Sequence, residues 1–206
     1  MKRRMLGAAL IIVGIIGLLA LSATYVPGLY GPYLSTPKRI DDAAELARSY
    51  VASLGYSDLA VKEVMEFQYN YYFIAYEKST GIGAFEGVIE KSGGMMGIVR
   101  PEEGPNMMWN DKYGHLGGMM GGGWASRRTY DEAAAAKMPV TEKDAEERAQ
   151  AYLDSYLPGS KIEDIETFYG YYTIHVLKDG KVCGMLSVNG YTGQIWYHTW
   201  HGAFIQ

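Results

Sequence analysis

The sequence predicts an α+β fold in which two repeats of a helix packed on a small antiparallel sheet follow one N-terminal transmembrane helix. Three observations support this prediction. An apolar run lies near the N-terminus, a helical pattern of small apolar residues occurs twice, and an aromatic segment follows each helical pattern. The predicted parts are a cytoplasmic N-terminus (1–5), a membrane anchor (6–26), a juxtamembrane linker (27–40), a first repeat (41–99), a linker (100–139) and a second repeat (140–206).

The apolar run at residues 6–26 contains no charged residue. About 20 residues that rise about 1.5 Å each span a hydrocarbon core of about 30 Å. Lys2, Arg3 and Arg4 precede the run, and positive flanks stay in the cytoplasm, so we expect an extracytoplasmic location for the rest of the chain. A cleaved signal peptide is the alternative, because residues 20–22 resemble a cleavage site, although such peptides usually have a shorter apolar core.

The part of the chain after the anchor is acidic. The whole chain has 206 residues and a formal charge of −4, and without its three N-terminal basic residues it has 16 basic against 23 acidic residues. No basic patch stands out, so nucleic acid is not an expected partner. Cys183 is the single cysteine. The folded part must therefore be held together by packing and not by internal disulfides.

A helix is expected at the start of each repeat. With an offset of 102, the apolar positions of the two stretches coincide at i, i+4, i+7 and i+8, which is one face of a helix. Thr141 and Asp144 form a capping-box pattern, which places the start of the second helix near Thr141. Asp41 or Asp42 is expected to cap the first helix. The two stretches are residues 43–54 and 145–156.

Aromatic and β-branched residues crowd residues 66–76 and 166–176, which is typical of strands. An offset of 100 aligns the tyrosines of these two segments. Turn signals follow at residues 79–81 and at Asp179-Gly180, where a type I′ turn is expected. A further strand and a short final strand follow in each repeat, which predicts an antiparallel meander with the helix on one face.

This pattern resembles the PepSY domain family. The resemblance rests on the alanine-rich helix, the aromatic strand, the hairpin and the closing segment at residues 186–195 (LSVNGYTGQI), whereas Gly93-Gly94 replace the Thr-Gly of that ending in the first repeat. The family is found in propeptides of secreted metallopeptidases and in membrane-bound or extracytoplasmic regulatory proteins. The resemblance implies a non-enzymatic binding module, tethered to the membrane, that regulates or inhibits a peptidase or a membrane protein.

Six tyrosines are the predicted partner-binding residues. They put aromatic rings on both faces of two equivalent strands. The helix covers one face of each strand, so the rings on the other face are expected to be exposed unless something else covers them. Exposed aromatic patches suit protein interfaces, and packing of the two sheets on one another is the alternative. The residues are Tyr69, Tyr71, Tyr72, Tyr169, Tyr171 and Tyr172.

The segment between the repeats is rich in Gly, Pro, Met and Trp, which is typical of a linker. Its methionines and one histidine are the predicted metal ligands, because thioether sulfur favours Cu(I). The alternatives are that methionine fills apolar gaps over the sheets, or that the segment has no fixed structure. The predicted ligands are Met107, Met108, His115, Met119 and Met120.

Three further histidines and the single cysteine are candidate site residues. His198 and His201 together with Cys183 suggest a Cys/His/His metal site. However, residues i and i+3 of a strand point to opposite faces, so a bend would be needed to bring the histidines together, and an aromatic edge is the alternative. His175 is expected on the less buried face of its strand, in a structural role. No nucleophile, metallopeptidase or phosphate-loop motif is present, so an enzyme is not expected.

Overall fold

The computed structural model describes residues 37–91, 99–102, 104–114 and 138–206. The predicted anchor at residues 6–26 lies outside these ranges. Within them, no helix is both long enough and apolar enough to cross a membrane.

The described chain has an α+β fold with a mostly antiparallel sheet, which confirms the predicted class. Both halves have the order helix, three strands, short fourth strand. The first half consists of α2 (Ile40–Ser53), β1 (Leu59–Glu66), β2 (Asn70–Glu77), β3 (Gly83–Glu90), β4 (Val99–Pro101) and a short helix α3 (Pro105–Trp109). The second half consists of α5 (Glu142–Tyr156), β5 (Ser160–Phe168), β6 (Tyr171–Lys178), β7 (Lys181–Asn189) and β8 (Ile195–Tyr197).

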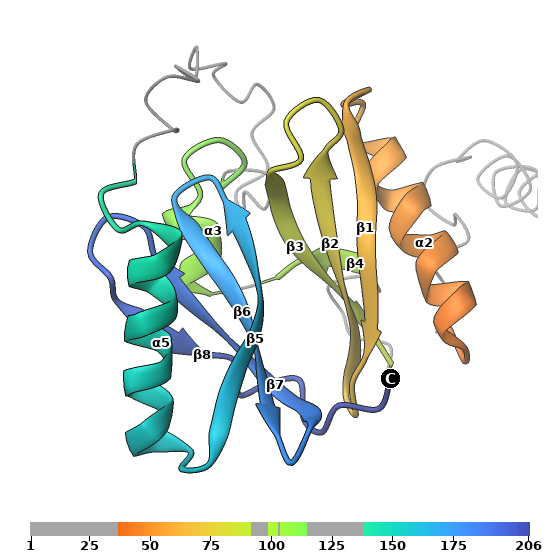
Figure 1. Cartoon of the computed structure of the whole chain (residues 1–206). Coiled ribbons are helices and arrows are strands. Elements are labelled where there is room, and N and C mark those ends of the chain that lie inside the picture. Colours follow the sequence, from red (N-terminus) through yellow and green to blue (C-terminus); the bar gives the residue numbers. More distant parts are fainter. Residues whose placement is uncertain (1–36, 92–98, 103, 115–137) are drawn as a thin grey trace, which may run out of the picture. The chain divides into compact units, whose positions relative to one another are not determined.

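The strands lie between the two long helices, with α2 outside β1–β3 and α5 outside β5–β8 (Figure 1). Strands β1, β2 and β3 pair antiparallel in that order, β4 pairs with β3, and β5 to β8 form a second antiparallel series. One parallel contact, between Gly83 and Phe168, joins the two series. A Cβ atom on Gly83 would lie 2.4 Å from the Phe168 ring, so only glycine allows this close approach.

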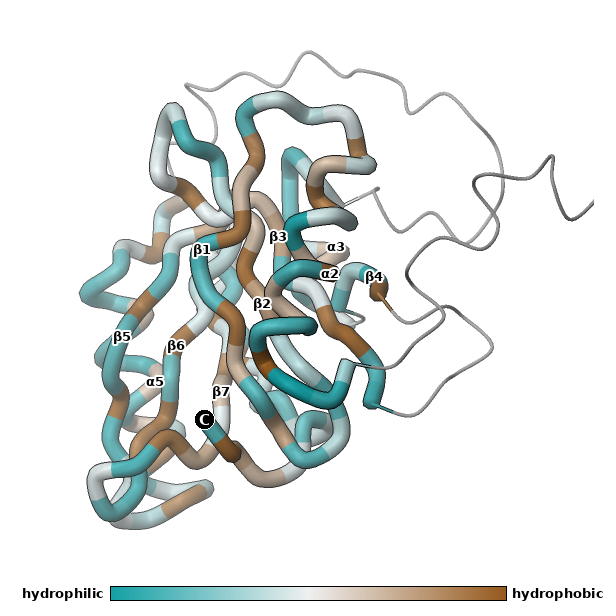
Figure 2. Tube along the Cα trace, turned by 90° about the vertical axis from the view of Figure 1, so that its right-hand side faces the viewer, coloured by the Kyte–Doolittle hydropathy of each residue, from teal (hydrophilic) through white to brown (hydrophobic). Residues whose placement is uncertain are grey.

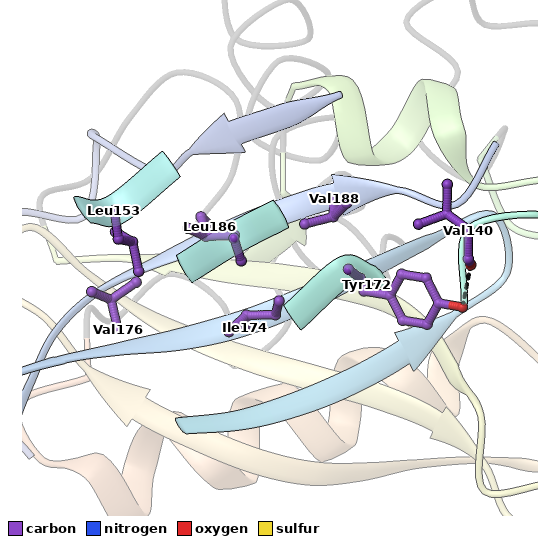
Figure 3. Close-up of a cluster of buried hydrophobic side chains, with 9 residues drawn as sticks. Val140, Leu153, Tyr172, Ile174, Val176, Leu186 and Val188 are labelled. Atoms are coloured by element: carbon purple, nitrogen blue, oxygen red, sulfur yellow. Dashed lines mark hydrogen bonds between the residues drawn. The ribbon is translucent and has the colours of Figure 1, made fainter. Parts of the chain in front are cut away.

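The helix α5 covers its sheet with small and apolar side chains. Ala145, Ala149 and Leu153 are fully buried against the second series of strands. Figure 3 shows apolar side chains of β6 and β7 gathered beneath this helix. The ring of Tyr172 belongs to this cluster, and its hydroxyl donates a hydrogen bond to the carbonyl of Val140 (2.9 Å). The predicted helical face is therefore confirmed in the second half.

The helix α2 covers the first series of strands in the same way. Ala43, Ala47 and Val51 are buried. The ring of Tyr50 makes edge contacts with the rings of Phe73 and Phe85. The prediction that Asp41 or Asp42 caps this helix is wrong, because the N-cap position is Arg39 and no side chain caps it there. The two aspartates lie in the first turn, where negative charge interacts favourably with the helix dipole.

The faces of the strands that point away from the helices pack on one another. Met65, Phe67, Tyr72 and Ile74 of the first half form one buried cluster with Phe168, Tyr171 and Met185 of the second half. In contrast, the residues of β5 between its buried ends are exposed or half-buried, and Figure 2 shows this strand as a mostly hydrophilic tube with short hydrophobic segments. The alternative interpretation, in which the two series of strands cover each other's aromatic residues, therefore holds for Tyr72 and Tyr171.

The hairpins differ by one residue from the predicted alignment. Each aromatic segment contains a tight turn followed by a strand. Phe67 pairs with Asn70 across the first turn, and Phe168 pairs with Tyr171 across the second. The structural offset is thus 101 and not 100. Since a shift of one residue moves a side chain to the other face of a strand, Tyr72 faces the other sheet whereas Tyr172 faces α5.

Residues 99–102 and 104–114 have more regular structure than the linker interpretation indicated. They contain β4 and α3, followed by a turn at residues 111–114. The buried side chain of Asn110 anchors this turn, because its amide group donates to the carbonyl of Ala84 (2.7 Å) and accepts from the backbone of Tyr113 (2.7 Å). Residues 115–137 lie outside the described part of the chain.

Candidate metal centre

Three side chains that are able to bind metal meet between the two halves of the fold. The imidazoles of His198 and His201 and the carboxylate of Glu102 each place one ligand atom within 4.8 Å of the other two. His201 Nε2 lies 2.8 Å from Glu102 Oε1, and His198 Nδ1 lies 3.8 Å from the same oxygen. The side chains of all three residues are at most 2% exposed.

The positions of these residues follow from strand pairing and one bend. Glu102 follows β4, and its backbone N–H donates to the carbonyl of Glu86 on β3 (2.8 Å). His198 follows β8, and its N–H donates to the carbonyl of Met185 on β7 (2.9 Å). The chain then bends at Trp200 and His201, so the two imidazoles reach the same side. This is the bend that a shared histidine site requires.

Hydrogen bonds on the far side of each imidazole fix its orientation. His201 Nδ1 lies 2.8 Å from Asn70 Oδ1, and an amide oxygen only accepts, so Nδ1 carries the proton and Nε2 keeps its lone pair. His198 Nε2 lies 2.8 Å from the hydroxyl of Ser187. With that nitrogen as the donor, the lone pair of Nδ1 points into the centre. Histidines that bind metal usually donate their other N–H in this way.

The inner atoms of the centre have no hydrogen-bond partner among the described residues. They are Glu102 Oε2, His198 Nδ1 and His201 Nε2, and Asn106 Oδ1 nearby in the buried polar network is a fourth such atom. The short contact of His201 with Glu102 lacks hydrogen-bond alignment, since the same nitrogen is without a partner. A buried polar atom left unpaired costs about 1–3 kcal/mol. Two unpaired imidazole nitrogens close to a carboxylate that also has an unpaired oxygen therefore indicate a ligand that would satisfy them together.

Burial also sets the ionisation of the centre. It raises the pKa of Glu102 to about 8, against the opposing effects of a hydrogen bond from Trp200 and the charge of Arg100. It lowers the pKa of His201 to about 4, and burial together with the neighbouring His201 and His175 lowers the pKa of His198 well below its ordinary value. Both imidazoles are thus neutral at neutral pH, which is the form that binds metal, whereas Glu102 must release its proton to become a ligand.

Aromatic rings enclose the centre. The indole N–H of Trp200 donates to Glu102 Oε1 (2.9 Å), and its ring stacks on His198 with centroids 4.6 Å apart. Trp196 stacks on Trp200 at 4.3 Å, and Phe67 stacks on His201 at 4.7 Å. These contacts exclude water and restrict the rotation of both imidazoles.

A second buried carboxyl group, that of Glu86, extends the polar network. It accepts hydrogen bonds from the hydroxyl of Tyr72 (2.7 Å) and from the amide of Asn106. Asn106 also donates to Ser187 (2.9 Å), which contacts His198. Burial, together with the charge of Glu102, raises the pKa of Glu86 to about 8. The network connects the centre to side chains of α3 and of three strands.

The predicted methionine ligands are not part of this centre. Met107 is half-buried and Met108 is 80% exposed, both on α3. His115, Met119 and Met120 lie outside the described residues, so copper binding by this set stays a prediction.

Cys183, the third predicted partner of the two histidines, is half-buried and packs against the cluster beneath α5. Glu102 takes the place that the sequence interpretation gave to the cysteine. His175 is buried, with its Nε2 atom 3.7 Å from Glu63 Oε2, so the expectation of a less buried face is wrong.

Five of the six predicted partner-binding tyrosines are enclosed. Only Tyr69, in the β1–β2 turn, is well exposed, at 55%. Tyr72 is next to the candidate centre, with its ring centroid 5.7 Å from that of His201. The five buried residues are Tyr71, Tyr72, Tyr169, Tyr171 and Tyr172.

Sequence reasoning missed Glu102. Its partner Trp200 lies 98 positions further along the chain, and no local spacing links a single glutamate to two distant histidines. The pair His198 and His201 was the available signal.

Comparisons with protein-family models, curated proteins and solved structures gave no match to this chain. The resemblance to PepSY domains therefore stays a prediction from the sequence pattern.

Proposed function

We propose that this chain is a non-enzymatic metal-binding protein that holds one divalent ion of the zinc class between Glu102, His198 and His201. The observation that carries the proposal is the convergence of three buried ligand atoms within 4.8 Å of one another, of which the two imidazole nitrogens have no hydrogen-bond partner among the described residues. Hydrogen bonds to Asn70 and Ser187 orient the two imidazoles in support of this role.

The ligand set favours a particular class of ion. Two imidazoles and one carboxylate are typical ligands of Zn²⁺ and of neighbouring divalent transition metals, whereas Cu(I) prefers sulfur. Tetrahedral ligands at about 2 Å from an ion lie about 3.3 Å apart. The spacings of 2.8 and 3.8 Å around Glu102 Oε1 are close to that value. A bound cation would also compensate the charge of an ionised Glu102 in this buried setting.

The cellular setting of this function rests on the sequence. We propose a single-pass anchor at residues 6–26 with the folded part outside the cytoplasmic face, supported by the basic flank at Lys2, Arg3 and Arg4. We also propose that the two halves are copies of one module, as their shared element order suggests. Regulation of a peptidase or a membrane partner remains a proposal from the family resemblance, and it would use surfaces other than the buried tyrosines.

Metal titration tests the proposal directly. The full chain in detergent micelles, stripped with a chelator, is expected to bind one Zn²⁺ per chain in competition with a chromogenic chelator. Co²⁺ in its place is expected to give the intense visible absorption of a four-coordinate site. Replacing one ligand, in Glu102→Gln or His201→Ala, should weaken binding about 100-fold or more, since even loss of a residue that orients a ligand costs about 10–100-fold.

Two controls separate this centre from the alternatives suggested by the sequence. Cys183→Ser should bind Zn²⁺ as the unchanged protein does, because the thiol lies outside the centre. Met107→Leu with Met108→Leu should do the same. Wild-type affinity in Glu102→Gln and His201→Ala, with circular dichroism showing that both are folded, would refute the proposed centre.

A further inference from the structure

The candidate centre lies where the C-terminal segment crosses from the second half of the fold to the first. Glu102 belongs to the first half, whereas His198 and His201 belong to the segment that follows β8. His201 also binds Asn70 of β2 and stacks on Phe67 at the end of β1. An ion held by these ligands would therefore connect the two halves through the last residues of the chain.

The segment beyond His201 pairs with the end of β1. The backbone N–H of Gln68 donates to the carbonyl of Ala203 (2.8 Å), and that of Ile205 donates to the carbonyl of Glu66 (2.8 Å). The ring of Phe204 packs edge-on against Phe67 with centroids 5.6 Å apart.

Gly202 brings the segment to this position with a φ of +75°, a conformation that suits glycine. A side chain at this residue would meet the ring of Tyr69.

Docking of this segment combines favourable contacts with unpaired polar atoms. Ile205 is 54% exposed, and the segment is joined to the end of β1 and the following turn by backbone hydrogen bonds of Glu66, Gln68 and Tyr69 and by an isolated bridge between Phe67 and Phe204. Without an ion, docking leaves Glu102 Oε2, His198 Nδ1 and His201 Nε2 buried and unpaired. An ion removes that cost only when the segment is docked, because two of its three ligands come from the segment.

We propose that metal binding at Glu102, His198 and His201 clamps the C-terminal segment onto the end of β1, so that occupancy of the centre controls whether residues 198–206 are docked. The inference rests on the proposed metal function and adds that the bound ion regulates docking of this segment. Release of the ion frees the segment and uncovers the backbone groups of Glu66 and Gln68 at the edge of β1, whereas binding covers them.

Hydrogen exchange on the full chain in detergent micelles, with and without Zn²⁺, tests the clamp. At a free zinc concentration about 100 times the Kd, the undocked population falls about 100-fold. Exchange at the amides of Gln68 and Ile205 is expected to slow by a comparable factor. The amide of Ile82, which bonds to Thr80 in the β2–β3 turn, is remote from the segment and should be unaffected.

A pair of variants in the segment tests the reverse direction. If zinc favours docking, docking must favour zinc by the same factor. Phe204→Ala removes an anchoring ring without touching a ligand, and the Kd for Zn²⁺ should rise about tenfold. Ile205→Ala, at an exposed neighbouring position, should leave the Kd within about twofold.

The outcomes distinguish the two proposals. Zinc binding with unchanged exchange at Gln68 and Ile205, and an unchanged Kd in Phe204→Ala, overturns the clamp and leaves the metal function standing. No zinc binding by the unchanged protein overturns both. Slower exchange together with the selective effect of Phe204→Ala supports the clamp.

Discussion

Glu77, at the end of β2, is a buried carboxylate that is paired with one lysine and accepts hydrogen bonds from three hydroxyl groups. Its side chain is 4% exposed and forms an ion pair with Lys112. It also accepts hydrogen bonds from the hydroxyls of Tyr113, Tyr169 and Thr80. Burial raises the pKa of Glu77, but these hydrogen bonds outweigh burial and the net pKa is lowered. The ionised form of this residue therefore stabilises the folded state.

Glu77→Gln is expected to lower the free energy of unfolding by about 1–3 kcal/mol at neutral pH, because it removes the charge from this network. The folded-state pKa lies below the ordinary value of 4.5, so the stabilisation is complete above pH 4.5 and is lost as the pH falls through the folded-state pKa. Urea unfolding of both proteins across this range measures the difference.

Glu147→Gln is the matched control for this experiment. Glu147 is 67% exposed and lies 3.7 Å from Lys143 on the surface of α5. Exposed pairs contribute at most about 1 kcal/mol. A difference between Glu77→Gln and the unchanged protein that stays constant from pH 7 to acidic pH would contradict the role given to the Glu77 carboxylate.

Buried carboxyl groups are the residues that sequence reasoning located least well. Counted over the whole residue, Glu77, Glu86 and Glu102 are each at most 3% exposed. Glutamate is almost never buried without a partner. Their partners come from distant parts of the chain, as in the bond between Tyr169 and Glu77 across 92 positions. Composition and local spacing do not indicate such distant contacts, so the sequence does not distinguish these carboxylates from exposed ones.

Elements whose determinants are local were predicted more successfully. The capping box is observed, since Thr141 Oγ1 accepts from the backbone of Asp144 (3.2 Å) and the Asp144 carboxylate accepts from the backbone of Thr141 (3.1 Å). The turn at Asp179-Gly180 has positive φ at both residues, as a type I′ turn requires. In both cases the deciding contacts lie within a few residues of one another.

The register of the aromatic strands was harder to predict because tyrosines occur on both faces. Tyr71 and Tyr172 face helices, whereas Tyr72 and Tyr171 lie between the sheets or at their junction. An alignment by residue type therefore fits an offset of 100 as well as the observed offset of 101. The β1–β2 and β5–β6 turns decide between the two offsets. Both turns lie within the segments 66–76 and 166–176, which the sequence interpretation treats as continuous strands.

The two long helices offer a direct comparison of capping. Thr141→Ala removes the capping box of α5 and should lower the free energy of unfolding by about 0.5–2 kcal/mol. Arg39→Ala changes the N-cap position of α2, where the side chain makes no capping bond, so it should have an effect below about 0.5 kcal/mol. Thermal or urea unfolding compares the two variants, and equal effects would show that the Thr141 cap contributes nothing specific.

At the scale of the whole molecule, the interior is shared between the halves. Phe168 stacks on Tyr171 with centroids 4.6 Å apart and an interplanar angle of 6°. It also fills the space above Gly83 of β3. The apolar cluster around it draws residues from β1, β2, β6 and β7. Neither half completes this core alone, so the described part of the chain should unfold as one cooperative unit.

Phe168→Ala tests this shared core in metal-free protein. Loss of a fully buried phenylalanine side chain costs about 3–5 kcal/mol. If the halves unfold together, hydrogen exchange at Phe73 in β2 and at Ile174 in β6 should report the same loss, although only Ile174 belongs to the mutated half. Tyr156→Ala, at a residue that is 52% exposed, should change the stability measured at Phe73 and at Ile174 by no more than about 0.5 kcal/mol. Destabilisation confined to Ile174 would mean that each half is stable by itself, and the centre at Glu102 would then join two independent bodies.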